Sequence, residues 1–94
     1  MIKIVMEEII YIESAKDYAK LFLVNGKNLL VKQSISSLEN ILSAHRFVRV
    51  HRSYIAAINK INSFTPTHII AGKITLPIGR LYKSRLMESL QEGK

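Results

Sequence analysis

Basic and hydroxyl side chains are concentrated in one short stretch near the middle of the chain. Arg49, His51 and Arg52 are followed directly by Ser53 and Tyr54. Because alternate residues of a strand point to opposite faces, we expect Arg49 and His51 on one face and Arg52 on the other. An arginine held rigidly beside hydroxyl donors suits recognition of phosphates and base edges. The alternative is that these charges form only a solvated strand face.

Apolar residues flank this basic stretch and should anchor it in a hydrophobic core. They are Phe47, Val48, Val50, Tyr54, Ile55 and Ile58. The pattern predicts strands over residues 47–50 and 54–56, joined at a tip formed by His51, Arg52 and Ser53. The tip would then be carried on a rigid support.

A second candidate site lies where a closing helix is expected to begin, at residues 80–91. Arg80 follows Pro77, Ile78 and Gly79, and a cation at a helix N-terminus opposes the helix dipole. An anionic or acceptor-rich ligand near the free N–H groups would explain this placement. Lys83 follows on the same helix face. The alternative is that Arg80 merely extends into water.

The overall charge favours a polyanionic partner. The chain has 14 Lys and Arg against 7 Asp and Glu, a formal net charge of +7. Nucleic acid or an anionic membrane would be attracted, but no apolar run approaches the roughly 20 residues needed to span a membrane. The basic residues are spread along the chain, which predicts a folded surface that gathers them from several loops.

Length and residue types indicate one non-catalytic domain. Ninety-four residues without cysteine fit a single domain lacking disulfides, and no signal peptide is recognisable, so a cytoplasmic protein is expected. His45, His51 and His68 match no common zinc spacing. No glycine-rich phosphate loop or paired acids are present. We expect no catalytic residue, cofactor or metal.

The remaining pattern predicts many short strands with one central and one terminal helix. The expected strands are residues 2–5, 9–13, 18–24, 28–32, 47–50, 54–56, 60–65, 68–71 and 74–76, with a single turn at residues 6–8. Asn25-Gly26 is the strongest hairpin signal. Alternation predicts Ile10 and Ile12 on one strand face, and Ile9 and Tyr11 on the other.

The central helix should begin near a serine. Ile35, Leu38, Ile41 and Leu42 have helical spacing. Ser34 or Ser36 can cap this helix, and Glu39 follows Ser36 at the distance of a capping-box partner.

Three motifs together resemble one protein family. The segments ESAKDY at 13–18, FVRVHRSYIAAINKI at 47–61 and LPIGRLY at 76–82 closely resemble the LytTR-type DNA-binding domain, and the likeness runs from about Ile2 to Leu90. It implies a mostly β fold of elongated antiparallel sheets over residues 1–94. Such domains usually form the C-terminal output half of bacterial response regulators.

The resemblance also implies a way of binding DNA. Loops enter successive major grooves of double-stranded DNA and bend it, commonly at paired direct repeats, in the control of transcription. A receiver domain should precede this chain. Phosphorylation there would promote pairing of two domains on DNA.

Base contacts carried over from the family fall on Ala19, Arg52 and Arg80. Arginine reads guanine through O6 and N7, so we expect guanine opposite both arginines. Ala19 departs from the polar residue found in other members. It could touch a thymine methyl group or leave the contact to Lys16 and Lys20. The residues expected at phosphates are His51, Ser53, Lys16, Lys20, Lys83 and Arg49.

Two other functions remain open at this point. The same basic surface could belong to an RNA-binding β module, although no run of exposed aromatic residues typical of RNA recognition is visible. It could also bind an acidic protein, in which case DNA affinity would be weak and indifferent to sequence.

Overall fold

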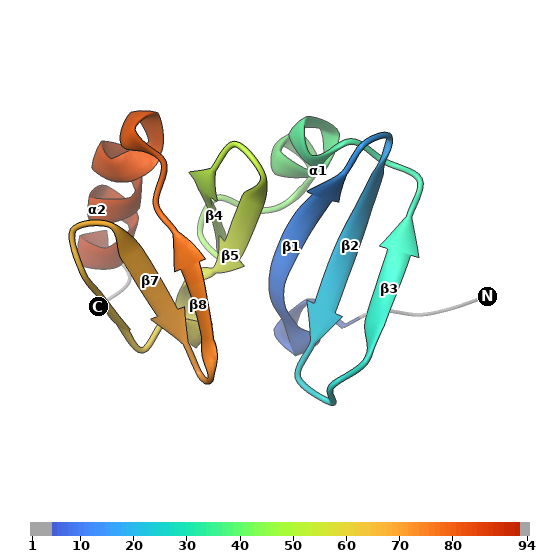
Figure 1. Cartoon of the computed structure of the whole chain (residues 1–94), viewed down its shortest axis with the longest axis horizontal. Coiled ribbons are helices and arrows are strands. Elements are labelled where there is room, and N and C mark those ends of the chain that lie inside the picture. The colour runs from blue at the N-terminus through green and yellow to red at the C-terminus, as the bar shows by residue number, and fades with distance from the viewer. Residues whose placement is uncertain (1–4, 93–94) are drawn as a thin grey trace.

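The structure is a computed structural model that describes residues 5–92, and it is elongated, with extents of 38 × 24 × 21 Å. It contains a five-stranded and a three-stranded antiparallel sheet (Figure 1). The expected mostly β fold, with one central and one C-terminal helix, is confirmed. Val5 lies outside any strand, and the rest of the strand predicted at 2–5 falls outside the described residues. A 3-10 turn, η1 (Met6–Glu8), follows.

The larger sheet is built from neighbouring hairpins. Its strands are β1 (Ile9–Ala15), β2 (Tyr18–Leu23), β3 (Asn28–Val31), β4 (Phe47–His51) and β5 (Tyr54–Ala57), in the order β3-β2-β1-β5-β4. The predicted Asn25-Gly26 turn joins β2 to β3, with Gly26 at a φ of 85° that favours glycine. The β1–β2 and β4–β5 connections are also tight turns.

An irregularity in β1 overturns the predicted assignment of its faces. Ile9 pairs with Leu23, but Tyr11 already pairs with Phe22, so an extra residue is inserted at Ile10. Such a bulge reverses the alternation. Ile9 and Ile12 therefore both lie in one core, instead of on opposite faces.

A second irregularity, in β4, corrects the prediction for the basic stretch. Arg49 pairs with Ile55, whereas His51 pairs with the adjacent Tyr54. Directly paired residues share a sheet face, and consecutive residues of β5 point to opposite faces. Arg49 and His51 therefore lie on opposite faces, and the extra residue between them is Val50.

The central helix α1 (Ile35–Ile41) begins at Ser34, whose hydroxyl accepts a hydrogen bond from the Ser37 N–H at 3.1 Å. Of the two predicted caps, Ser34 is therefore the one used. Glu39 is not a capping-box partner and instead pairs with Arg49 across the core.

The second sheet contains β6 (Ser63–Phe64), β7 (His68–Ala71) and β8 (Ile74–Pro77). The strand predicted at 60–65 is shorter than expected, because the 3-10 turn η2 (Ile58–Lys60) occupies the preceding residues. The closing helix is also divided: a 3-10 turn, η3 (Arg80–Tyr82), precedes α2 (Lys83–Glu92).

Two hydrophobic cores lie on opposite faces of the β4–β5 pair. The first packs α1 on the larger sheet and includes Ile9, Ile12, Leu21, Ile35, Phe47 and Ile55. The second joins the smaller sheet and α2 to the other face and includes Val48, Val50, Ala56, Ile69, Leu76 and Leu86. Residues 47–50 are consequently all buried, and the β4–β5 turn projects from the most firmly packed strand.

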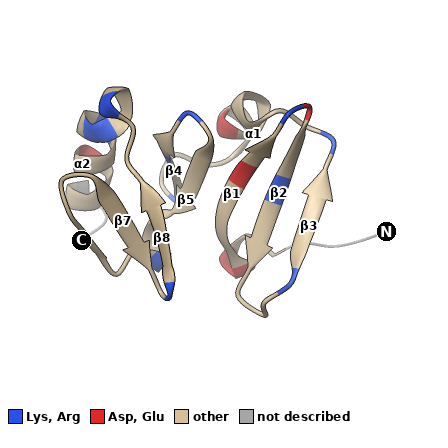
Figure 2. Ribbon diagram, in the orientation of Figure 1, with Lys and Arg blue, Asp and Glu red and all other residues tan. Residues whose placement is uncertain are grey.

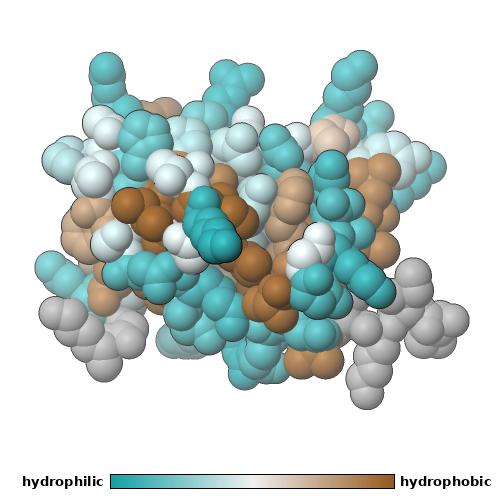
Figure 3. Space-filling model, turned by 60° about the horizontal axis from the view of Figure 1, so that its bottom comes forward, coloured by the Kyte–Doolittle hydropathy of each residue, from teal (hydrophilic) through white to brown (hydrophobic). Residues whose placement is uncertain are grey.

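The surface offers separate apolar patches. On the face shown in Figure 3, hydrophobic residues lie in small areas surrounded by hydrophilic ones. Within residues 5–92, no helix has the length and hydropathy to cross a membrane.

Candidate nucleic-acid interface

Three basic segments lie along one edge of the molecule, at the top of Figure 1. They are the β1–β2 turn with Lys16, the β4–β5 turn with Arg52 and Ser53, and the start of the C-terminal helical region with Arg80 and Lys83. Figure 2 shows Lys or Arg on each of these segments. We call these five residues the basic edge.

The β4–β5 turn is fixed by backbone hydrogen bonds on both sides. The Ser14 N–H at the end of β1 donates to the Ser53 carbonyl at 2.9 Å. The Ser53 N–H in turn donates to Nδ1 of His51 at 3.1 Å. His51 is half-buried, and its ring lies 5.6 Å from the Tyr54 ring. The turn is thus pinned while the Arg52 side chain remains exposed.

Arg49 braces the turn from inside the molecule. Its Nε donates to the His51 carbonyl at 2.9 Å, and its Nη2 donates to the Arg52 carbonyl at 2.5 Å. Its Nη1 donates to Glu39 at 2.6 Å. The side chain is only 7% exposed. All three guanidinium nitrogens are occupied internally, so in this structure the Arg49 side chain is not available for the predicted phosphate contact.

Glu39 joins elements that are far apart in the sequence. One carboxylate oxygen accepts from Arg49 on β4, and the other accepts from Nη1 of Arg85 on α2 at 2.9 Å. Because Glu39 itself lies on α1, this network connects both helices to β4. The sequence pattern did not reveal that Glu39 connects these elements. An arginine among apolar strand residues was the available signal, since a buried cation needs an acidic partner.

The η3 turn packs against the end of β4. The Gly79 N–H donates to the Val50 carbonyl at 2.7 Å, and the Tyr82 ring lies 5.5 Å from the Arg49 guanidinium carbon. Gly79 has little space, because a Cβ there would lie 2.9 Å from Cδ2 of Tyr82. This close packing holds the exposed Arg80 beside the β4–β5 turn.

The β1–β2 turn presents Lys16 but not Ala19. Lys16 adopts a φ of 60°, as tight turns require, and it is exposed. Ala19 is 0% exposed, within the core under α1. In this structure the Ala19 side chain is therefore not accessible for the predicted base contact. Lys20 lies on the opposite sheet face, with its Nζ 5.4 Å from the Phe22 ring centre, so it is set back from the turn.

The cations of the basic edge are available to a ligand. Within the described part of the chain, ion pairs form between Arg46 and Glu7, and from both Arg49 and Arg85 to Glu39. None of these pairs uses a cation of the basic edge. The only acid in its turns is Asp17, next to Lys16.

Three ionisable side chains, Glu7, Tyr11 and Tyr54, have shifted pKa values. Burial raises the pKa of the Tyr11 and Tyr54 hydroxyls, and the nearby Glu13 carboxylate acts in the same direction. A hydrogen bond from Arg46 lowers the pKa of Glu7. The Tyr11 and Tyr54 hydroxyls therefore stay protonated, and the Glu7 carboxylate stays ionised, at neutral pH.

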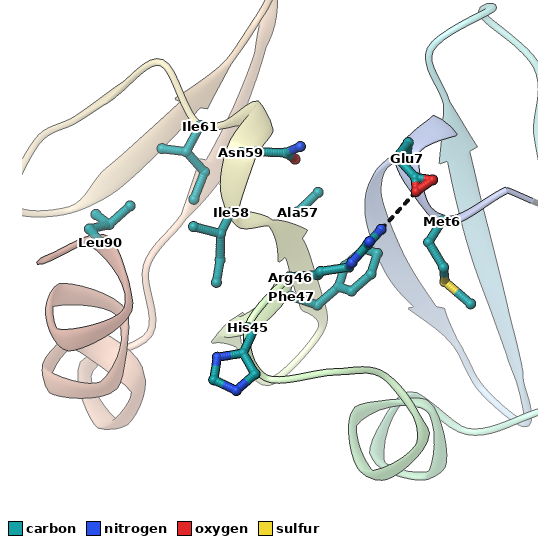
Figure 4. Close-up of a pocket in the computed structure, with 10 residues that line it drawn as sticks. All are labelled: Met6, Glu7, His45, Arg46, Phe47, Ala57, Ile58, Asn59, Ile61 and Leu90. Carbon is teal, nitrogen blue, oxygen red and sulfur yellow. Dashed lines mark hydrogen bonds and ion pairs between the residues drawn. The ribbon is translucent and has the colours of Figure 1, made fainter. Parts of the chain in front are cut away.

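A cavity of about 480 Å³ lies at the opposite ends of β4 and β5 from the basic edge. Figure 4 shows Glu7 and Arg46 paired across it, at 2.7 Å. Its lining residues are Met6, Glu7, His45, Arg46, Phe47, Ala57, Ile58, Asn59, Ile61 and Leu90. Within residues 5–92, no cluster of acids and histidines could hold a metal ion.

Comparison with known proteins identifies both the sequence pattern and the fold. The family model described as "LytTr DNA-binding domain" matches residues 1–91. A solved structure with a TM-score of 0.85 covers 95% of this chain and 86% of its own, at 22% identity. It is the LytTr DNA-binding domain of a Bacillus cereus protein described as a methyl-accepting/DNA response regulator. No curated protein matches the chain.

Proposed function

Because the chain belongs to the LytTR family of DNA-binding domains, we propose that it binds double-stranded DNA sequence-specifically through the basic edge. The observation that carries this proposal is the exposure of Arg52 and Arg80 on turns that are pinned to each other through β4. Flexible surface arginines would attract any polyanion. Arginines on braced turns can additionally be held in register with base edges.

The shape of the edge suits the major groove. That groove is about 12 Å wide and admits an α-helix or a two-stranded β-ribbon. The β4–β5 hairpin is such a ribbon, and Arg52 lies at its tip. In the proposed complex Arg52 and Arg80 each donate to O6 and N7 of a guanine.

Other residues position the domain on the duplex. Lys16, Lys83 and Ser53 contact phosphates, as does Lys20 where the backbone passes over the sheet face. His51 reaches a phosphate through the ring nitrogen not bonded to Ser53. Such contacts set orientation without carrying sequence information.

The proposed cellular role is transcriptional control as the output domain of a cytoplasmic two-component response regulator. The Bacillus cereus protein supports this role by its description. We propose that two copies bind paired direct repeats, and that an upstream receiver promotes this pairing. The isolated domain should then bind a single half-site weakly and a double site with much higher affinity. Equal affinity per half-site on the single and the double site would contradict the proposed pairing of two domains.

Selection from a randomised duplex pool at near-physiological salt tests sequence-specific binding directly. We expect enrichment of a short guanine-containing motif, often as spaced direct repeats. A lack of enrichment, with binding that vanishes as salt rises, would instead indicate general attraction to polyanions. Competition with single-stranded RNA, and with an acidic peptide, would then separate the two alternative functions.

A further inference from the structure

Leu81 is the most exposed large hydrophobic side chain among the described residues. It is 90% exposed, whereas the next, Ile41, is 63% exposed. It lies in η3 directly after Arg80 and therefore within the basic edge segment. Isolated exposed leucines are common on protein surfaces, so exposure alone assigns no role.

The geometry of η3 prevents Leu81 from withdrawing into the protein. Side chains of consecutive residues in a 3-10 helix point about 120° apart, since there are about three residues per turn. Tyr82 is turned inward, against the Arg49 guanidinium. The neighbouring positions, Arg80 and Leu81, are both exposed and are directed away from that contact.

The backbone of this turn is anchored as well. Gly79 donates to the Val50 carbonyl, and the Tyr82 N–H donates to the Gly79 carbonyl at 3.0 Å. Arg80 and Leu81 are thus presented together, as one cation and one apolar group, from an anchored backbone segment.

DNA offers a specific partner for such a pair. The C5-methyl group of thymine is the apolar feature of the base edges in the major groove. Resting on the proposed DNA binding, we propose that Leu81 contacts a thymine methyl group next to the guanine read by Arg80. The thymine contact that the family resemblance left open for Ala19, which is buried here, would in this way be made by Leu81.

Paired selections test this contact. Two randomised duplex pools with the same random design are prepared, one with thymine and one with uracil, which lacks the methyl group. Each is selected with the wild-type chain, with Leu81→Ala, and with Leu30→Ala. Leu30 is a matched control, because it is 55% exposed on β3, away from η3.

The wild type should enrich thymine beside the Arg80 guanine in the first pool and lose that preference in the second. On the best thymine duplex, replacing thymine by uracil should weaken wild-type binding about fourfold, which corresponds to about 0.8 kcal/mol for one methyl-sized apolar group. Leu81→Ala should bind the two duplexes equally, whereas Leu30→Ala should behave as the wild type. Thermal unfolding should show all three proteins folded alike.

The outcomes separate this contact from DNA binding itself. A guanine motif without a thymine preference, or a thymine preference that persists in Leu81→Ala, would overturn the Leu81 contact while leaving the proposed function intact. The exposed leucine would then belong to a protein interface. Failure of the wild type to enrich any motif would overturn both proposals.

Discussion

Arginines in the same hairpin have opposite surroundings in this domain. Arg49 is nearly fully buried and donates to two backbone carbonyls and to Glu39. Arg52 is exposed, and only its backbone carbonyl takes part in that network. One arginine therefore shapes the turn, and the other is free to meet a ligand. Residue type alone does not distinguish these roles.

The buried pair should matter for stability. Replacing Arg49 with Met leaves one Glu39 carboxylate oxygen and two turn carbonyls without the donor that Arg49 supplies, while Arg85 still pairs with the other oxygen of Glu39. We expect a loss of about 2–4 kcal/mol in the free energy of unfolding, somewhat reduced by the partial exposure of Glu39. Urea denaturation measures this loss. Arg46→Met is the matched control, because the Arg46–Glu7 pair is 56% exposed on both sides and solvent screens its attraction, so its loss should be much smaller. Equal losses in the two variants would contradict a bracing role for Arg49.

The variants Arg52→Ala and Lys83→Ala should distinguish sequence-specific DNA binding from general attraction to DNA. Arg52→Ala removes a side chain but keeps the carbonyl that Arg49 holds, so the turn should persist. We expect it to cost about 1–3 kcal/mol on the selected duplex and to relax the guanine preference. Lys83→Ala should weaken binding to all duplexes alike. Titrations against the selected and a scrambled duplex test both variants, and an equal loss for Arg52→Ala on both duplexes would rule out base reading.

At the scale of elements, the packing of η3 against the end of β4 should determine where Arg80 lies in the basic edge. Gly79 has φ −73° and ψ 143°, which alanine adopts easily, so the effect of Gly79→Ala is steric. Its Cβ would lie 2.9 Å from Cδ2 of Tyr82 and 3.4 Å from the His51 Cα. We expect about 1–3 kcal/mol of destabilisation from this overpacking, together with weaker DNA binding because Arg80 is displaced.

Gly72→Ala separates these two effects. Gly72 lies in the β7–β8 turn with a φ of +64° and no neighbour within 4 Å. The strained backbone should cost about 1–2 kcal/mol, yet the affinity for DNA should not change. Thermal unfolding and DNA titration of both variants make the comparison. A similar loss of affinity in Gly72→Ala would attribute the effect of Gly79→Ala to general destabilisation.

Local signals in the sequence were sufficient for most elements. Asn25-Gly26 located a hairpin, and the spacing of apolar residues located both helices. The bulge at Ile10 was not predictable, because a single inserted residue leaves no clear mark in an apolar run. Likewise, the strand expected at 60–65 is reduced to Ser63–Phe64, with η2 ending at Lys60 and residues 61–62 in no regular element.

The motifs located the exposed turns that carry Arg52 and Arg80, and their contacts with bases stay a prediction. The site was not predictable where burial depends on distant elements. Arg49 is enclosed by Glu39 from α1 and by Tyr82 from η3, and neither contact is visible in the strand's own pattern. Ala19 is covered in the same way, by residues of the core under α1.

At the scale of the whole molecule, lysines and arginines that are dispersed in the sequence come together on the basic edge. The net charge of +7 comes from residues along the whole chain. Folding directs one subset of the cations to the basic edge, while Lys73 lies in the β7–β8 turn, at the opposite end of the view in Figure 1. Long-range attraction involves all of these charges, but direct neutralisation of phosphates should involve only the basic edge and the adjacent Lys20 and His51.

Salt dependence should reveal this division. Each phosphate neutralised in a B-DNA complex contributes about −0.9 to the slope of log K against log salt concentration. Lys83→Ala should therefore make the slope shallower by about one, whereas Lys73→Ala should leave it nearly unchanged despite removing the same charge. Titrations of the selected duplex over a range of salt concentrations give the three slopes. Equal changes for the two lysine variants would mean that net charge, and not the basic edge, governs binding. A change confined to Lys83→Ala would place the phosphate backbone against the start of α2.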